Sequence, residues 1–224
     1  MKKMLITLTP GQSHPGATLP LLEYLPEEQV VHMGLLDALN ADEIHQLYAP
    51  VAGEKMLTAG LRDGAQVQLS AARVEMALQQ KLLALEDEGY ECILLLCSAG
   101  IGRLQTRQAM VLEADRLVPP LIAAIADDHQ VGIVVAAEEP LRQQRYKWER
   151  LSKPPCFAVV SPWLPDDEKL VDAALALQEQ GADVVVLDCV GYHPRQQDFL
   201  QKLLGIPVLL SSGLVAQLAA ELML

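Results

Sequence analysis

Two stretches of the chain repeat one another: residues 83–97 read LALEDEGYECILLLC, and residues 175–189 read LALQEQGADVVVLDC. They align without a gap, so that Leu-Ala-Leu, a glycine, an apolar run and a final cysteine coincide. A glycine after a helical stretch can adopt the left-handed conformation that ends a helix. An apolar run without alternation is typical of a strand buried on both faces of a parallel sheet. The repeat therefore predicts one helix–strand unit used twice, in two related halves.

The same alternation of short apolar runs and longer helical stretches extends along the chain. Helices are expected over 71–88 and 167–180, each ending at a glycine (Gly89 and Gly181). A second likeness, between VPPLI (118–122) and IPVLL (206–210), follows the two repeated segments. Strands are expected over 4–9, 29–33, 66–69, 93–97, 131–136, 157–160, 184–189 and 208–210. Strand–helix alternation of this kind predicts an α/β fold with right-handed crossovers.

Composition excludes several classes of protein. The chain has 224 residues, of which 51% are hydrophobic, and this excludes intrinsic disorder for most of it. A net charge of −12 argues against a nucleic-acid partner and against an anionic membrane surface. No apolar run is long enough to span a bilayer. Four cysteines in a chain of this length do not form a disulfide scaffold, so we expect a cytoplasmic protein.

Motifs for cofactors are absent from the sequence. No dinucleotide-binding glycine pattern and no P-loop is present, and the cysteines and histidines do not show the spacing of a structural zinc site. We therefore expect no cofactor and no metal.

The two repeated cysteines are the strongest candidates for chemistry. Cys97 and Cys189 each end a predicted strand, and ligands of open α/β sheets bind at the carboxyl ends of strands. Backbone N–H groups of the turn that follows favour a thiolate and bind anions. If the two halves face each other, one thiol lies on each side of a small carboxylate ligand. Taking a proton from one face of a carbon and returning it to the other needs such a base and acid.

The alternative for each cysteine is that of a small buried hydrophobic side chain. We assign this structural role to Cys92, which begins its strand, and to Cys156.

Other candidates for substrate binding follow the ends of predicted strands. Their structural alternatives are a Pro-Gly turn after the first strand, a solvated helix start at Glu138 and Glu139, and a helix-start or surface histidine near Cys189. Arg103 and Arg107 are spaced to clamp a carboxylate or to form a solvated face. The predicted substrate-binding residues are Thr9, Gln12, Ser13, Ser98, Ala99, Gly100, Glu138, Gly191 and His193.

The whole chain resembles the AroM family, a bacterial group. The segments that carry this resemblance extend over most of the sequence. They are YAPVAGE (48–54), LRDG (61–64), GYECILLLCSAG (89–100), DHQVGIVVAAEE (128–139), GADVVVLDCVGYH (181–193) and IPVLLSSGLVAQLAAELM (206–223).

More distantly, the two cysteine segments resemble those of the aspartate/glutamate/hydantoin racemase superfamily. This resemblance implies two pseudo-symmetric flavodoxin-like lobes with parallel sheets, a cleft between them, and cofactor-independent racemisation by two cysteines. The superfamily has Leu-Gly-Cys-Thr-His in its second half, where this chain has Asp188 for the glycine and Val190 for a threonine that helps to hold a carboxylate. His193 lies four residues after Cys189 instead of two, and no asparagine follows Cys97. These departures predict a different substrate pocket.

The lobes are expected over 1–115 and 116–224, with the C-terminal helix packing back on the first lobe. The leading hypothesis is a racemase or isomerase for a small carboxylate or amino-acid-like metabolite. One alternative is a metabolite-binding or regulatory protein that has kept the cleft without the chemistry. Another uses a single thiol as nucleophile or proton donor, as in decarboxylation. A homodimer is compatible with the sequence.

Overall fold

The structure is a computed structural model that describes residues 4–13, 23–97, 100–136, 141–162 and 167–223. The chain divides into two compact units. The first contains Met1–Glu113 and Leu218–Leu224, and the second contains Ala114–Gln217. No helix among the described residues is long and apolar enough to cross a bilayer.

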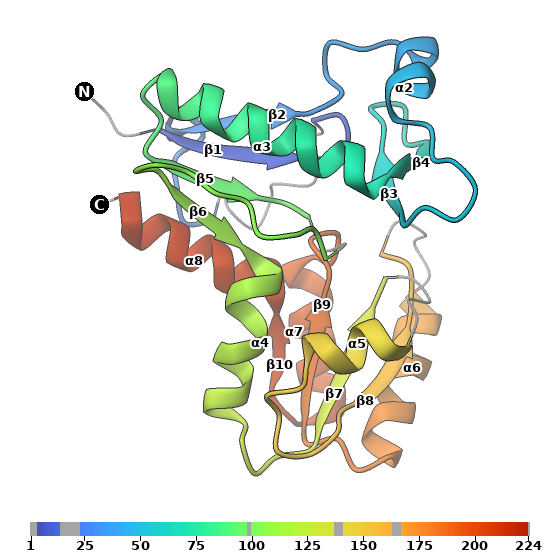
Figure 1. Ribbon diagram of the computed structural model, residues 1–224. Helices are drawn as coiled ribbons and strands as arrows, with labels where there is room; N and C mark the ends of the chain where they lie inside the picture. The colour runs from blue at the N-terminus through green and yellow to red at the C-terminus, as the bar shows by residue number, and fades with distance from the viewer. Residues whose placement is uncertain (1–3, 14–22, 98–99, 137–140, 163–166, 224) are drawn as a thin grey trace. The chain divides into compact units, whose positions relative to one another are not determined.

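The first unit is built on a four-stranded parallel sheet in the order β2-β1-β5-β6. Helix α3 (Ala71–Asp87) lies along one face of this sheet (Figure 1). Four of its apolar residues, Val74, Leu78, Leu82 and Leu85, recur at helical spacing and are fully buried, which is why this segment packs as a helix on the sheet. The strands are β1 (Leu5–Thr9), β2 (Val30–Gly34), β5 (Cys92–Leu95) and β6 (Met110–Glu113).

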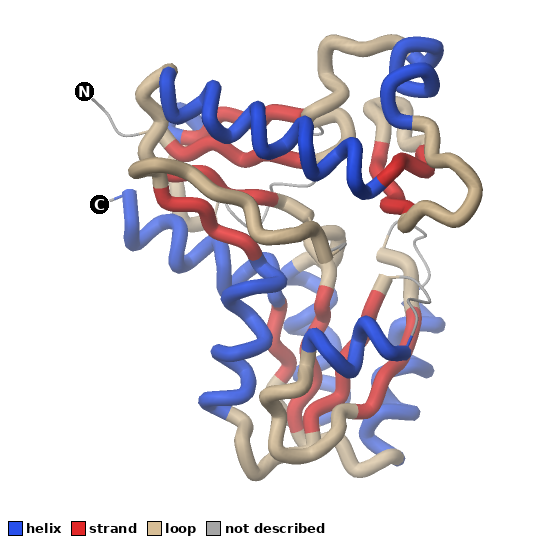
Figure 2. The backbone as a smooth tube through the Cα atoms, in the orientation of Figure 1, coloured by secondary structure: helices blue, strands red, loops and turns tan. Residues whose placement is uncertain are grey.

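Between β2 and α3 the first unit carries a short helix and a hairpin. Helix α2 (Ala41–Tyr48) starts at Asn40, whose side chain accepts a hydrogen bond from the Glu43 N–H. A short 3₁₀ turn, η2 (Glu27–Gln29), lies before β2. Strands β3 (Met56–Gly60) and β4 (Gln66–Ser70) form a separate antiparallel sheet (Figure 2). The strand expected over 66–69 therefore exists, but it does not belong to a parallel sheet.

The second unit contains a second four-stranded parallel sheet, in the order β10-β9-β7-β8. In Figure 1, α4 and α5 lie in front of this sheet, and α6 and α7 lie behind it. The strands are β7 (Val131–Val135), β8 (Cys156–Val159), β9 (Val184–Asp188) and β10 (Val208–Leu210). The helices are α4 (Ala114–Ile125), α5 (Leu141–Lys147), α6 (Asp167–Glu179) and α7 (Pro194–Leu204). Helix α8 (Ser211–Met223) begins in the second unit and ends in the first.

Both parallel sheets have the same strand order. Counted along the chain within each sheet, the order is second, first, third, fourth, which is the start of the flavodoxin-like order. The repeated segments supply the third strand of each sheet, β5 and β9. The glycines before them, Gly89 and Gly181, both have a φ of 92°, as expected for glycines that end helices. The predicted α/β fold with two repeated parallel sheets is confirmed.

The likeness between residues 118–122 and 206–210 is one of sequence and not of structure. The first segment, with Pro119 and Pro120, lies inside α4. The second leads into and forms β10. The true counterpart of β10 is β6, the fourth strand of the first sheet, which has no proline.

The loop after β1 is pinned to the hairpin at one close backbone contact. The Gln12 N–H donates to the Gly60 carbonyl at 3.0 Å. A Cβ atom at Gly11 would lie 2.2 Å from the Gly60 oxygen, which is closer than two such atoms can approach. A Cβ atom at Gly60 itself would meet nothing within 4 Å. Gly11 is thus required where the loop crosses the hairpin, whereas Gly60 is not.

We expect Gly11→Ala to lower the free energy of unfolding by about 1–3 kcal/mol, because the added methyl group must push two backbone segments apart. Gly60→Ala, at the other side of the same contact, should change it by less than about 0.5 kcal/mol. Urea unfolding of the two variants measures the difference. Equal effects would show that the close contact does not exist.

Candidate functional site

The two repeated cysteines occupy equivalent places in the two units. Cys97 lies two residues after β5, and Cys189 directly follows β9. Each is at the carboxyl end of an inner strand, next to the first strand of its sheet, where the strand order reverses. Ligands of open α/β sheets bind at this switch point. Topology thus places both cysteines at the edge where a ligand is expected.

Both cysteine side chains also belong to the apolar core of their own unit. Cys97 packs with Ile93 and Leu95 on the face that α3 covers. Cys189 packs with Val185 and Leu187 on the face that α6 and α7 cover. The exposed fractions are 9% for Cys97 and 4% for Cys189. In each unit the cysteine is the last core residue on its face of the strand, so it borders both the core and the carboxyl edge.

The turn after Cys189 directs a donor at its sulfur. The Gly191 N–H points to the Cys189 Sγ at 3.4 Å, an arrangement that favours a thiolate. Tyr192 is 1% exposed, and its hydroxyl donates to the Val160 carbonyl at 2.6 Å. Burial, reinforced by the negative charges of Cys189 and Asp188, raises the pKa of Tyr192 well above its usual value. Tyr192 therefore stays neutral and anchors the turn to the end of β8.

His193 is the N-cap residue of α7. The His193 Nδ1 accepts a hydrogen bond from the backbone N–H of Arg195 at 3.2 Å. The backbone N–H of His193 donates to the side-chain oxygen of Gln196 at 2.8 Å. Pro194 then occupies the first helical position, where its missing N–H has no cost. The imidazole is exposed, so the helix-start alternative describes its contacts, and a role toward substrate stays a prediction.

A buried polar network lies next to Cys189 and was not predicted from the sequence. Asp188, the last residue of β9, accepts from Lys147 Nζ at 2.6 Å and from the Ser211 hydroxyl at 3.0 Å. Lys147 also donates to Asp115 at 2.7 Å. Burial opposes the charged form of Lys147, but the carboxylates of Asp188 and Asp115 outweigh it and raise the Lys147 pKa. Removing one partner of such a buried ion pair lowers the free energy of unfolding by roughly 3–5 kcal/mol.

Asp188 and Cys189 point to opposite faces of the sheet. Side chains alternate along a strand, and Cys189 shares the face of Val185 and Leu187. The partners of Asp188 come instead from α5 and from the first residue of α8. Consecutive residues thus supply a thiol on one face and a neutralised carboxylate on the other.

In the first unit, Thr9, Gln12 and Ser13 hold the loop after β1 in place. Thr9 Oγ1 accepts from the Gly11 N–H at 3.4 Å. The Gln12 side chain donates to two carbonyls of the segment after β2, at 3.3 and 3.4 Å, and accepts from the Arg62 N–H at 3.0 Å. These groups hold the structure at the carboxyl edge, and their predicted contacts with substrate stay predictions.

The carboxylate of Asp37 holds this loop through hydrogen bonds and an ion pair. It accepts from the Ser13 N–H at 2.7 Å, the Ser13 hydroxyl at 3.0 Å and the Gly34 N–H at 2.7 Å, and it pairs with Arg62 at 2.8 Å. Burial alone would raise the pKa of Asp37, but these donors and the Arg62 charge outweigh it and lower the pKa below 3.8. The ionised carboxylate is thus part of the folded structure of the edge.

Asp37→Asn should lower the free energy of unfolding by about 1–2 kcal/mol at neutral pH, since charge-assisted hydrogen bonds become neutral ones. Because the folded pKa of Asp37 is depressed, its contribution is full above the unfolded pKa and is lost as the pH falls through the folded value. The difference between variant and wild type should therefore shrink from pH 5 toward pH 3. A difference that stays constant over this range in urea unfolding would contradict the assignment.

Of the predicted substrate-binding residues that follow Cys97 and β7, Gly100 is among the described residues. The Gly100 carbonyl accepts from Lys55 Nζ at 2.8 Å, and Gly100 has a φ of 56°. Ser98, Ala99 and Glu138 lie outside the described residues. Among the described residues no group of three His, Cys, Asp or Glu side chains is arranged to hold a metal ion.

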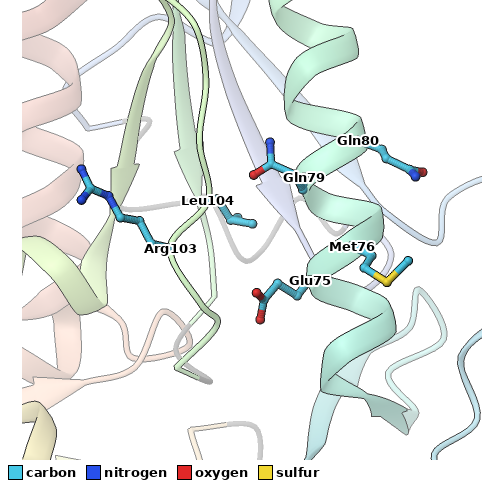
Figure 3. Close-up of a pocket in the computed structure, with 6 residues that line it drawn as sticks. All are labelled: Glu75, Met76, Gln79, Gln80, Arg103 and Leu104. Atoms are coloured by element: carbon cyan, nitrogen blue, oxygen red, sulfur yellow. The ribbon is translucent and has the colours of Figure 1, made fainter.

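A hollow of about 310 Å³ lies between α3 and the segment after Cys97, but it contains neither cysteine (Figure 3). Its polar side chains already bind the segment: Glu75 accepts from the Gly102 N–H, and Gln79 exchanges two hydrogen bonds with the backbone of Gln105. Figure 3 shows Arg103 directed away from both. Arg107 pairs with Asp87, so the two arginines do not converge on a shared anion.

The family model described as AroM protein matches residues 6–223. The chain belongs to the AroM family. No curated protein matches the sequence.

Solved structures share the fold of this AroM protein. Unliganded arylmalonate decarboxylase has 13% sequence identity, with a TM-score of 0.60 over 99% of this chain and 92% of that one. Allantoin racemase from Klebsiella pneumoniae has 14% identity and a TM-score of 0.60, over 98% and 87%. Glutamate racemase from Francisella tularensis subsp. tularensis SCHU S4, in complex with D-glutamate, has 11% identity and a TM-score of 0.59, over 99% and 81%. The AroM chain therefore has the racemase-like two-lobe α/β fold.

Proposed function

We propose that this AroM protein is a cofactor-independent racemase or isomerase that acts on a small carboxylate or amino-acid-like metabolite. The observation that carries the proposal is the equivalence of Cys97 and Cys189. Each follows the third strand of its sheet, in two units with the same strand order, and each lies at the switch point. The fold shared with racemases adds support.

In this reaction one cysteine begins as a thiolate and the other as a thiol. The thiolate takes the proton from the α-carbon, whose electron pair passes into the adjacent carboxyl group. The second thiol then donates its proton to the opposite face of the carbon. The products are the inverted substrate and an enzyme with the protonation of its two cysteines exchanged. No oxidant, reductant or cofactor enters the balance.

The test is solvent deuterium exchange in D₂O with L-aspartate, L-glutamate, allantoin and an arylmalonate. The wild type should incorporate deuterium at the α-carbon of one of these compounds. Cys97→Ser and Cys189→Ser should each lower exchange by about 10²–10⁴-fold, since a hydroxyl is a far weaker base at neutral pH. Cys156→Ser, half-buried on the edge strand β8, is the matched control and should retain full exchange. Exchange that survives both substitutions would refute the two-cysteine mechanism.

A second candidate is a metabolite-binding or regulatory protein without catalysis. The observation in its favour is that both cysteines count among buried core residues and that Gln12, Ser13 and His193 are used in internal hydrogen bonds. Such a binder should show a rise in melting temperature with a ligand but no deuterium exchange.

The single-thiol alternative predicts a different result. The protein would release carbon dioxide from the arylmalonate, and this release would need only one of the two cysteines.

A further inference from the structure

The buried network around Asp188 is the feature of the second unit that the proposed reaction does not use. Asp188 is 5% exposed, and Ser211 is 1% exposed. The side chain of Lys147 is 14% exposed and that of Asp115 is 19% exposed, so one ammonium group and two carboxylates are largely withdrawn from water together. The Lys147 Nζ also lies 5.8 Å from the ring centroid of Trp148. The chain therefore maintains a costly charged cluster beside Cys189.

The geometry of the cluster links it to Cys189 through one peptide unit. Asp188 is held at both carboxylate oxygens, Oδ2 by Lys147 and Oδ1 by Ser211. The next residue is Cys189, whose side chain leaves the opposite face of the sheet. A carboxylate that is fixed at both oxygens fixes the end of β9, and so it fixes the direction in which the cysteine side chain leaves the strand.

The cluster also sets the charge nearest to the sulfur. Leu177 of α6 and Leu200 of α7 belong to the apolar cluster that contains Cys189, and Tyr192 keeps its hydroxyl on the Val160 carbonyl. The charged groups of the described network are Asp188, Lys147 of α5 and Asp115 of α4. Without Lys147, the carboxylate next to Cys189 would disfavour a thiolate.

We propose that Lys147 is a positioning residue for Cys189, acting through Asp188 to fix the end of β9 and to balance the charge beside the sulfur. This inference rests on the proposed function, because a base or acid at Cys189 needs both a fixed direction and an accessible thiolate. Lys147 itself touches no reacting atom. Its two carboxylate partners keep it charged, so it acts as a constant cation and does not transfer a proton.

The test is a titration of the cysteines by NMR in the full chain, labelled with [3-¹³C]cysteine. The Cβ signal of each cysteine reports its thiol–thiolate equilibrium without a reagent that must reach the sulfur. Lys147→Met should raise the titration midpoint of Cys189 by about one pH unit, and Asp188→Asn should lower it by about as much. Lys147→Arg should restore the wild-type midpoint. Cys97 should titrate unchanged in every variant.

Opposite shifts in the two variants cannot arise from a general loss of structure, which would move Cys189 in the same direction in both. Lys202→Met removes an exposed lysine of α7 as the matched control and should leave Cys189 unchanged. If Lys147→Met does not fold, Asp188→Asn and Lys147→Arg decide the question. An unchanged Cys189 midpoint in Asp188→Asn, or a shift of the same sign in both charge-removing variants, would overturn the inference.

The titration also separates this inference from the proposed function. Deuterium exchange with an unmoved Cys189 midpoint would uphold the function and overturn the role of Lys147. Opposite midpoint shifts without exchange on any tested compound would uphold the role of Lys147 at Cys189 and count against the racemase.

Discussion

A carboxylate buried at the end of β9 is stable only where a cation reaches it, and Lys147 supplies that cation from the end of α5. The ion pair imposes conditions on much of the second unit. Helix α5 must end at the height of the β9 terminus, α4 must begin where Asp115 meets the ammonium group, and α8 must begin with the hydroxyl of Ser211 on Asp188. Four elements from distant parts of the sequence are thus located by one carboxylate and one ammonium group.

At the carboxyl edge of the first sheet, a carboxylate also connects several segments, but its interactions are weaker. Asp37 also gathers segments around a carboxylate, but its donors are mainly backbone N–H groups and the exposed Arg62. Its side chain is 27% exposed, so water screens the pair and the cost of leaving it unpaired is smaller. Asp188 is more fully sealed from solvent than Asp37, and Asp188 adjoins a cysteine.

Local patterns explain which parts of the fold could be predicted from sequence. The repeated segments predicted α3, α6, β5 and β9, because helix periodicity, a terminal glycine and an apolar run are all local signals. Strand β6 was missed because Glu113 interrupts its apolar run and Met110 is exposed at its start. Helix α4 was missed because Pro119 and Pro120 indicate an interruption, although they lie inside it.

The polar network could not have been predicted in the same way. Its members stand at 115, 147, 188 and 211, and no spacing connects them. Sheet order and helix packing alone bring them together. The one local signal was Asp188 itself, a charged residue at the end of an otherwise apolar strand, which requires a buried partner wherever the strand is covered on both faces.

The alternation of side chains along β9 also explains why the two departures from the racemase-like motif differ in their consequences for the proposed chemistry. Asp188 replaces a glycine, but its side chain faces away from Cys189 and is neutralised there, so it leaves the thiol in place. Val190 replaces a threonine within the turn that follows the cysteine, and it removes a hydroxyl donor from that turn. Proton transfer at Cys189 is therefore compatible with the first change. In the proposed reaction, the second change acts on how the substrate carboxylate is held, whereas the first change leaves the thiol in place.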